Sequence, residues 1–413
     1  MSAEPPLLSA VVARLANPDI HLAAYGSVTF PLIGILQAPI LTLLSLSTAM
    51  SKDWDSFLKG RKVMFYLGGG LTLLYLLIAF TPLYYVIVED LIGAPPEVIE
   101  PARLGMYVGL PWAFAVAYRR FHQGVLIRME HSRAVTVGTM LRFMADALVI
   151  ISAFMIGSIP GTVVATAMMV CGVVTEAVYV GFRVRPVLKY ELKNAPSLQD
   201  KIMLRDMIAF FIPLAITPLL SQLIRPIGSA ALSRMPNPLL TLAIWPVISG
   251  FSFLIVTPGA AYNEVVIAML DRPGARRSVQ KFMYILMAVQ FSLMMVLAFT
   301  PLAYNWFWKV SGLTPDLALL ASRAFQVLIP ASLISPLNSW FTGAIVHSRR
   351  SRAITEGMII YLSVYIAGLA AGVAFASVSG IFIAVTASML ASLSQTVWLG
   401  IRSRPAIRAL EDA

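Results

Sequence analysis

The sequence has few charged residues for its length. Of its 413 residues, 12% are charged and 58% are hydrophobic, whereas a soluble domain has about 25% charged and 45–50% apolar residues. This composition excludes a soluble enzyme, a nucleic-acid-binding module and a disordered chain. Because about 20 apolar residues cross one bilayer, the apolar content suffices for about ten to twelve crossings. We therefore expect a multi-pass membrane protein with the lipid bilayer as its solvent.

The sequence also lacks the groupings that mark metal and catalytic sites. With one cysteine, Cys171, neither a disulfide framework nor a cysteine metal site can form. The four histidines show no HxxxH or HExxH spacing, so no metal site is predicted. No Walker motif, GxSxG sequence or pair of catalytic carboxylates lies in a loop. We expect neither an enzyme nor a cofactor.

Eleven apolar stretches are long enough to span a membrane as helices. They fall at 20–49, 63–92, 103–127, 134–156, 160–182, 206–232, 239–269, 282–308, 315–346, 353–375 and 379–401. Several contain prolines, which membrane helices tolerate where neighbouring helices satisfy the freed carbonyls. Gly68, Gly69 and Gly70 lie inside one stretch and predict a close helix crossing.

Basic residues alternate between connections. The segments 52–62, 128–133, 183–205, 272–281, 349–352 and 402–408 hold 22 of the 31 lysines and arginines, and the opposite connections hold five. Basic loops face the cytoplasm, and this rule accounts for the net charge of +11 without a nucleic-acid partner. The pattern predicts an inner-membrane protein with a cytoplasmic C-terminus.

An internal repeat relates the two halves. IAFTPL at 78–83 recurs as LAFTPL at 297–302, and in the same register RVRP at 183–186 recurs as RSRP at 402–405. Each half carries its basic loops at corresponding places, which predicts parallel repeats. The expected organisation is a six-helix repeat at 1–187, a cytoplasmic linker at 188–205, and a second repeat with a short tail at 206–413.

The register also bears on the start of the chain. The second repeat opens with the helix 206–232, whose counterpart in this register would begin about fourteen residues before Met1. We expect a twelve-helix design with a truncated first helix, hence about 11 full spans. The start codon is either assigned too late, which we favour, or natural.

Charged residues inside a membrane are expensive and by default mark a functional interior. Arg225, in SQLIRPIGS, lies nine residues before Arg234, roughly 13 Å below the outer boundary at 1.5 Å per residue. It is either a substrate ligand, beside a helix loosened by Pro226, or a snorkelled arginine that staples helices.

A second group lies near the cytoplasmic side of the first repeat. It comprises Arg119, Arg120, His122, Gln123, Arg142, Asp146 and Glu176. Arg142 and Asp146 are four residues apart and share a helix face. Three arginines against two carboxylates leave a positive balance, unless the group is only a self-neutralising network. In the second repeat the comparable polar residues are Glu264 and Asn338, although Glu264 is near enough to Asp271 to lie at the interface.

At these residues the sequence resembles the multidrug/oligosaccharidyl-lipid/polysaccharide exporter (MATE-like) superfamily, and within it the progressive ankylosis (ANK-like) family. The opening helix IPLAITPLLSQLIRPIGSAALSR carries the resemblance, together with Gln222, Arg225, Pro226, Arg234, Pro258, Glu264, His122, Gly124, Thr342 and Gly343. The sequence departs from the pattern at its shortened start. It also has Asn338 where the family pattern has a basic residue, and places Arg119 and Arg120 at the matching positions of the first repeat.

The resemblance implies an all-α exporter of a small organic anion, such as pyrophosphate, a nucleoside triphosphate or citrate. Arginine suits phosphate and carboxylate because its planar guanidinium donates two hydrogen bonds. The expected substrate ligands are Arg225, Gln222, Asn338, Arg119, Arg120 and His122. The candidates for coupling a proton or sodium ion are Asp146, Glu176, Glu264 and Arg142. A flippase for a lipid-linked substrate or a multidrug exporter is the alternative, and a non-transporting membrane scaffold the third possibility.

Overall fold

The structure is a computed structural model that describes residues 4–196, 203–270, 275–348, 352–375 and 379–409. Across these ranges the backbone is helical, and no strand occurs in them. The chain divides into two compact units. The N-terminal unit is Leu15–Pro226, and the C-terminal unit combines Met1–Arg14 with Ile227–Ala413.

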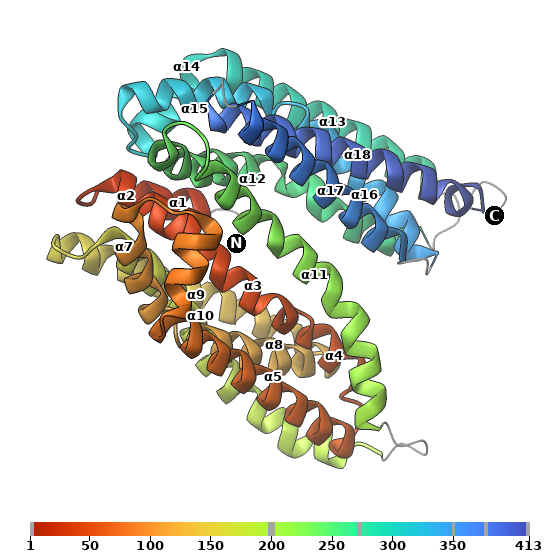
Figure 1. Ribbon diagram of the computed structural model, residues 1–413. Helices are drawn as coiled ribbons and strands as arrows, with labels where there is room; N and C mark the ends of the chain where they lie inside the picture. The colour runs from red at the N-terminus through yellow and green to blue at the C-terminus, as the bar shows by residue number, and fades with distance from the viewer. Residues whose placement is uncertain (1–3, 197–202, 271–274, 349–351, 376–378, 410–413) are drawn as a thin grey trace. The chain divides into compact units, whose positions relative to one another are not determined.

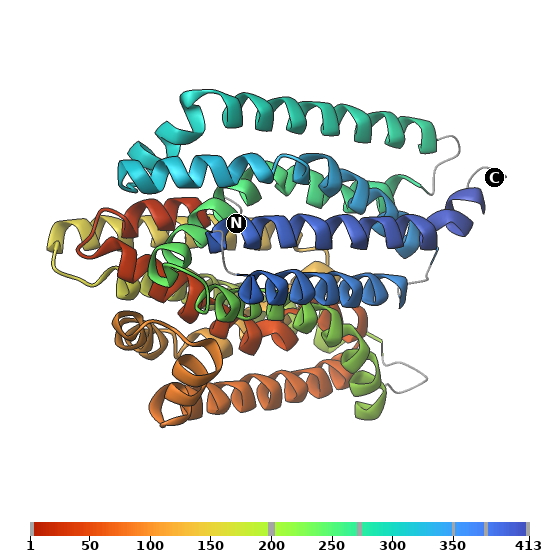
Figure 2. The same ribbon diagram turned by 45° about the horizontal axis from the view of Figure 1, so that its top comes forward.

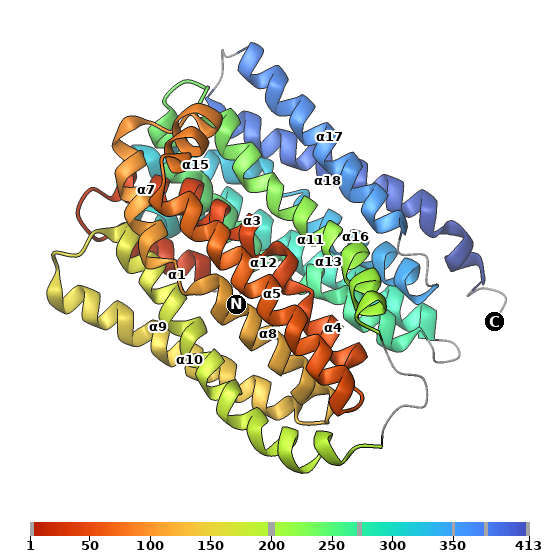
Figure 3. The ribbon, with the colours of Figure 1, turned by 60° about the horizontal axis from the view of Figure 1, so that its bottom comes forward.

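The N-terminal unit is built around the helices α8, α9 and α10. Its elements are α2 (Pro18–Ala23), η1 (Ala24–Thr29), α3 (Phe30–Leu41), α4 (Leu43–Met50), α5 (Trp54–Phe80), α6 (Leu83–Tyr85), η2 (Val86–Ile92), α7 (Pro96–Val108), α8 (Trp112–Arg128), α9 (Ser132–Ile156), α10 (Gly161–Tyr190) and η3 (Leu192–Asn194). The first part of α11 (Leu204–Leu232) also belongs to this unit. Helix α10 packs against α7, α8 and α9, and α8 also contacts α3, α4 and α5. Figure 3 shows α9 and α10 side by side.

The C-terminal unit has a comparable helix set. Its elements are α1 (Glu4–Val12), the end of α11, α12 (Pro238–Met269), α13 (Ala275–Phe299), α14 (Pro301–Asn305), η4 (Trp306–Val310), α15 (Pro315–Val327), α16 (Ala331–His347), α17 (Arg352–Ala374) and α18 (Gly380–Ala409). Helix α16 contacts α12, α13, α17 and α18. The same neighbours are visible in Figure 1, and Figure 2 shows α13 as one straight helix in teal. Helix α16 is therefore the centre of this unit.

The predicted all-helical membrane fold is confirmed. In the described residues, eight helices are long and apolar enough to cross a membrane, and a ninth span forms if α15 and α16, bent by 44°, are counted as one. The predicted stretch 63–92 was wrong as a single helix. Helix α5 ends at Phe80, and Pro82 begins a new turn, because proline cannot donate to the preceding helical turn. Likewise 103–127 breaks at Gly109–Pro111 between α7 and α8.

The predicted repeat appears in the backbone. Asn17 and Asn237 have φ angles of 49° and 54°, and each precedes the proline that begins α2 or α12. Gly93 and Gly312 have φ angles of 73° and 71° and follow the π-helical segments η2 and η4. Positive φ is uncommon outside glycine and asparagine, so coincidence at two pairs of positions supports one backbone design used twice.

The three-glycine run in α5 makes a closer crossing at one position only. A Cβ on Gly68 would lie 2.9 Å from the Cβ of Ala117 in α8. Gly69 and Gly70 have nothing within 4 Å of an added Cβ. The predicted close crossing is therefore confirmed for Gly68 and wrong for its two neighbours.

Candidate functional site

The charged residues of the first repeat come together where α8 faces α9 and α10. Arg119 of α8 forms an ion pair with Glu176 of α10, and the Nε2 of Gln123 donates to the Oε1 of Glu176 at 2.7 Å. Arg119 is 3% exposed and Glu176 is 1% exposed. Burial strips water from both charges, so each depends on the other for its stability. This contact crosses 57 residues of sequence.

A second pair lies one helical turn apart on α9. The Nε of Arg142 is 4.0 Å from the Oδ2 of Asp146, and both side chains are buried. Gly172 of α10 makes room for them, because an added Cβ there would overlap Oδ1 of Asp146 and come within 2.9 Å of Cγ of Arg142. The absence of a side chain at this glycine lets α10 approach the charged face of α9.

Arg120 gives the group its positive balance. Its side chain is partly buried, and it forms no ion pair with any described residue. Its Nε is buried without a hydrogen-bond partner among those residues. Glu176 acts on it as an opposite charge, and Arg119 and Arg142 act on it as like charges. The three arginines therefore outnumber the two carboxylates in space as well as in sequence.

His122 packs among aromatic rings. Its Nδ1 lies 2.8 Å from the backbone oxygen of Tyr118, which requires the proton to be on Nδ1. The centroid of its ring is 4.2 Å from that of Tyr118, and the ring contacts those of Phe57 and Phe121 edge-on. These contacts fix the ring in the core of the unit.

Gln222 and Arg225 lie on α11 against α3 of the same unit. The guanidinium carbon of Arg225 is 4.9 Å from the centroid of the Phe30 ring. The Oε1 of Gln222 is 3.1 Å from where a Cβ on Gly34 would lie. Arg225 is exposed, and a cation over an aromatic face gains about 0.5–1 kcal/mol at such sites. Phe30 thus orients an arginine that stays accessible.

Asn338 of α16 lines a cavity of about 490 Å³ in the C-terminal unit. Its Nδ2 donates to the Oγ1 of Thr396 at 3.1 Å, and its Oδ1 accepts from the Oγ1 of Thr342 at 3.3 Å. None of the 19 described residues that line the cavity is charged. Glu264 of α12 is exposed and does not line it.

Sequence reasoning missed most of this cavity. Six serines contribute to its wall, namely Ser249, Ser252, Ser335, Ser339, Ser388 and Ser392. Isolated serines in apolar helices give no motif. The repeat register was the available signal. In that register Asn338, Thr342, Tyr361 and Gln395 of this wall correspond to Arg119, Gln123, Arg142 and Glu176 of the charged cluster.

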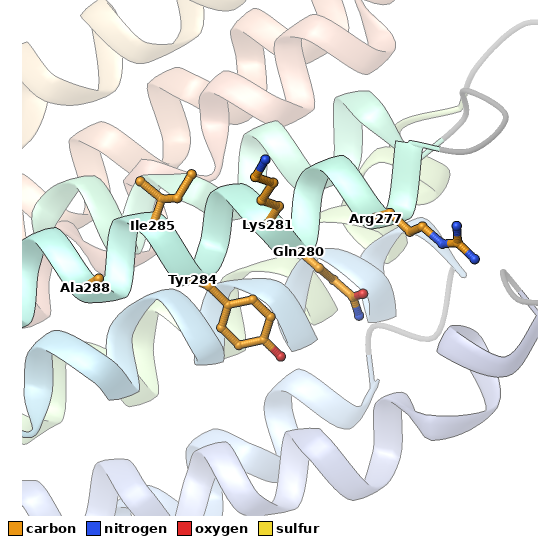
Figure 4. A pocket seen from close by; sticks show the side chains of 6 residues that line it. All are labelled: Arg277, Gln280, Lys281, Tyr284, Ile285 and Ala288. Atoms are coloured by element: carbon orange, nitrogen blue, oxygen red, sulfur yellow. The ribbon is translucent and has the colours of Figure 1, made fainter.

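A hollow of about 450 Å³ lies along α13 and is lined by Arg277, Gln280, Lys281, Tyr284, Ile285 and Ala288. Figure 4 shows that all six come from one helix and point in different directions: Lys281 and Ile285 to one side, Gln280 and Tyr284 to the other, and Arg277 away from both. Side chains that diverge cannot enclose a ligand, so this surface is not a candidate site.

Comparison with known proteins identifies the fold. No protein-family model matches the sequence, and no curated protein matches it either. Among solved structures, the chain is similar to an inward-facing multidrug resistance MATE family transporter of the MOP superfamily, with a TM-score of 0.76, 14% identity, and coverage of 99% of this chain and 96% of that one. It is also similar to the lipid II flippase MurJ in an inward closed conformation, with a TM-score of 0.64, 13% identity, and coverage of 96% and 85%.

A third similar structure is a MOP superfamily transporter from Pyrococcus furiosus, described as having a binding pocket of reverse polarity that suggests a different function. The TM-score is 0.59 at 16% identity, over 98% of this chain and 95% of that one. At these identities the likeness establishes a shared fold over nearly the whole chain. The predicted MATE-like fold is thereby confirmed.

Proposed function

We propose that the protein is a secondary transporter that exports a small organic anion carrying phosphate or carboxylate groups. The solved structures of similar fold are transporters and a flippase, which supports movement of a substrate across the membrane. In such folds two lobes expose a substrate site alternately to either side. The two compact units, Leu15–Pro226 and Met1–Arg14 with Ile227–Ala413, would be the two lobes. Within the superfamily we favour an ANK-like member.

The observation that carries the anionic substrate is the surplus of arginine. Arg225 is exposed and oriented by Phe30, and Arg120 is a cation beyond those balanced by Glu176 and Asp146. A guanidinium binds phosphate or carboxylate with two parallel hydrogen bonds. The proposed substrate ligands are Arg225, Gln222, Asn338, Arg119, Arg120 and His122.

Coupling to a proton or sodium ion would act through the carboxylates. Protonation of Glu176 would remove the charge that holds Arg119, and protonation of Asp146 would do the same for Arg142. Either event would free an arginine, so ion binding and anion binding would be linked. Glu264, exposed on α12, is the third coupling candidate. We place the protein in the inner membrane with a cytoplasmic C-terminus.

A flippase for a lipid-linked substrate is the second candidate. It is favoured by the uncharged wall of the cavity around Asn338, and the likeness to MurJ fits it. An anion alone would make little use of such a wall.

Transport by purified protein in liposomes tests the proposal. We expect saturable uptake of radiolabelled citrate, pyrophosphate or ATP above empty liposomes, and loss of that uptake in Arg225→Gln. Arg323→Gln is the matched control, because it removes an exposed arginine of α15. Absence of transport for all three anions, or an Arg225→Gln variant at the wild-type rate, would reject the anion proposal. Translocation of a lipid-linked saccharide instead would favour the flippase.

A further inference from the structure

The charged cluster and the uncharged cavity occupy equivalent places in the two repeats. In the register that aligns IAFTPL at 78–83 with LAFTPL at 297–302, Asp146 corresponds to Tyr365, which is buried and does not line the cavity. Four other cluster residues and their counterparts are Arg119 and Asn338, Gln123 and Thr342, Arg142 and Tyr361, and Glu176 and Gln395. All four members of the second set line the cavity.

Side-chain packing supports this correspondence. A Cβ added to Gly138 of α9 would lie 3.3 Å from the Cγ of Glu176, and one added to its counterpart Gly357 of α17 would lie 3.4 Å from the Cγ of Gln395. The same two helices therefore meet at the same residues in each unit.

The two sets differ in how far they are buried. Arg119, Gln123, Arg142 and Glu176 are all buried, and Glu176 is paired with Arg119 and Gln123. Their four counterparts are all partly exposed. In the N-terminal unit the side chains fill the space with ion pairs. In the C-terminal unit shorter or uncharged side chains leave about 490 Å³ open, within the range of small-molecule pockets.

The hydrogen bonds of the wall determine what could fill this space. Four serines donate their hydroxyl protons to backbone oxygens: Ser249 to Pro246, Ser335 to Val256, Ser339 to Ala260 and Ser388 to Val385. Each serine oxygen keeps lone pairs that can accept. The wall is thus rich in acceptors, which suits a ligand that donates hydrogen bonds and is unfavourable for an anion.

The remaining side chains of the wall further limit the kinds of ligand that the cavity could bind. The amides of Asn263, Asn338 and Gln395 both donate and accept, and Trp245 and Tyr361 add flat aromatic surface. No carboxylate lines the cavity among the described residues, so a cation would find no counter-charge there to offset its lost hydration. A neutral group with several hydroxyls satisfies both conditions.

We propose that this cavity binds an uncharged, hydroxyl-bearing group, a polyol or a sugar ring. The proposal adds a binding group to the proposed transport function. It rests on that function only because it treats Asn338 as part of a substrate site. A substrate that satisfies both proposals would carry a hydroxylated part as well as an anionic one.

Calorimetric titration of the full-length protein in lipid nanodiscs, without sugar-based detergent, tests this assignment. Maltose is the neutral probe, and pyrophosphate and tetraethylammonium are the charged ones. We expect saturable maltose binding that neither ion displaces. Asn338→Leu should weaken it about tenfold or more, as expected for lost buried hydrogen bonds. Tyr361→Phe, which removes one hydroxyl without changing shape, should weaken it less.

Two further variants test whether a loss of maltose binding is specific to the cavity. The double variant Asn338→Arg with Gln395→Glu recreates in the C-terminal unit the pair formed by Arg119 and Glu176, and should fold while losing maltose binding. Ser363→Leu, on the exposed face of α17, should bind maltose as the wild type does. A folded wild type that does not bind maltose, an Asn338→Leu variant with unchanged affinity, or displacement by pyrophosphate would overturn the proposal.

The two hypotheses fail separately. Maltose binding without any anion transport would support the cavity assignment and reject only the anion proposal. Anion transport that depends on Arg225 in a protein without maltose binding would do the reverse.

Discussion

Arg119 and Glu176 form an ion pair in which both side chains are almost fully buried, at 3% and 1% exposure. Gln123 adds a hydrogen bond to the same carboxylate. Removal of one partner leaves the other charge buried without the ion pair that offsets its lost hydration, so we expect this pair to matter for folding.

We expect Glu176→Gln to lower the free energy of unfolding by about 3–5 kcal/mol, the usual cost of breaking a buried pair by deleting one partner. The double variant Arg119→Met with Glu176→Met should recover most of this loss, since well-packed apolar residues often replace a buried pair without penalty. Thermal unfolding in detergent measures both. Equal melting temperatures for the wild type and Glu176→Gln would contradict the pair's structural role.

Gly172→Ala should destabilise the N-terminal unit, because the new methyl group would overlap Asp146 and press on Arg142. Overpacking of this kind costs about 1–3 kcal/mol. Gly69→Ala is the matched control: its Cβ meets nothing within 4 Å, and alanine is the better helix former. Retention of folded protein after heating should fall for the first variant and not for the second. Equal losses would argue against the close approach of α9 and α10.

Arg225→Lys should restore only part of the transport lost in Arg225→Gln, because lysine keeps the charge and loses the two-pronged geometry. Both variants should melt within a few degrees of the wild type, because Arg225 is exposed and contacts of exposed charged side chains contribute little to stability, about 0–1 kcal/mol each. Initial uptake rates and melting curves on the same preparations give both quantities. A Gln variant with a much lower melting temperature would show that Arg225 holds helices together instead of binding substrate.

Reporter fusions test the orientation. A reporter after Pro405 and one in the linker 188–205 should both read as cytoplasmic, because 22 basic residues lie in the connections on that side and five in those opposite. A reporter at Gly93, between the end of η2 and α7, should read as external. A periplasmic signal after Pro405 would reverse the topology.

The helical content and the repeat could be predicted from the sequence because both depend on local information. Apolar runs of spanning length form helices in the structure, and the repeat register reappears in the positive φ angles of Gly93 and Gly312. The helix breaks at Thr81 and Pro111 were harder to predict. Proline inside an apolar run is compatible with either a continuous or a broken helix, and tertiary packing decides between them.

The site was less predictable for a physical reason. Arg142 and Asp146 share a helix face, so their proximity followed from spacing alone. Arg119 meets Glu176 only because α8 and α10 pack together, which no local pattern encodes. The cavity is harder still, since it is defined by side chains that are too short to fill a space, and serines in apolar helices resemble ordinary packing residues.

The left-handed turns at Asn17 and Asn237 imply a history for the molecule. Both halves have the same backbone bend before the same proline, while the residues at the centre differ, charged in the N-terminal half and neutral in the C-terminal half. A duplicated ancestor with two identical halves would have had either a cavity in each half or a charged cluster in each half. If the two copies then specialised, the ion-paired cluster would stabilise the N-terminal unit, and the cavity would leave the C-terminal unit able to bind a ligand.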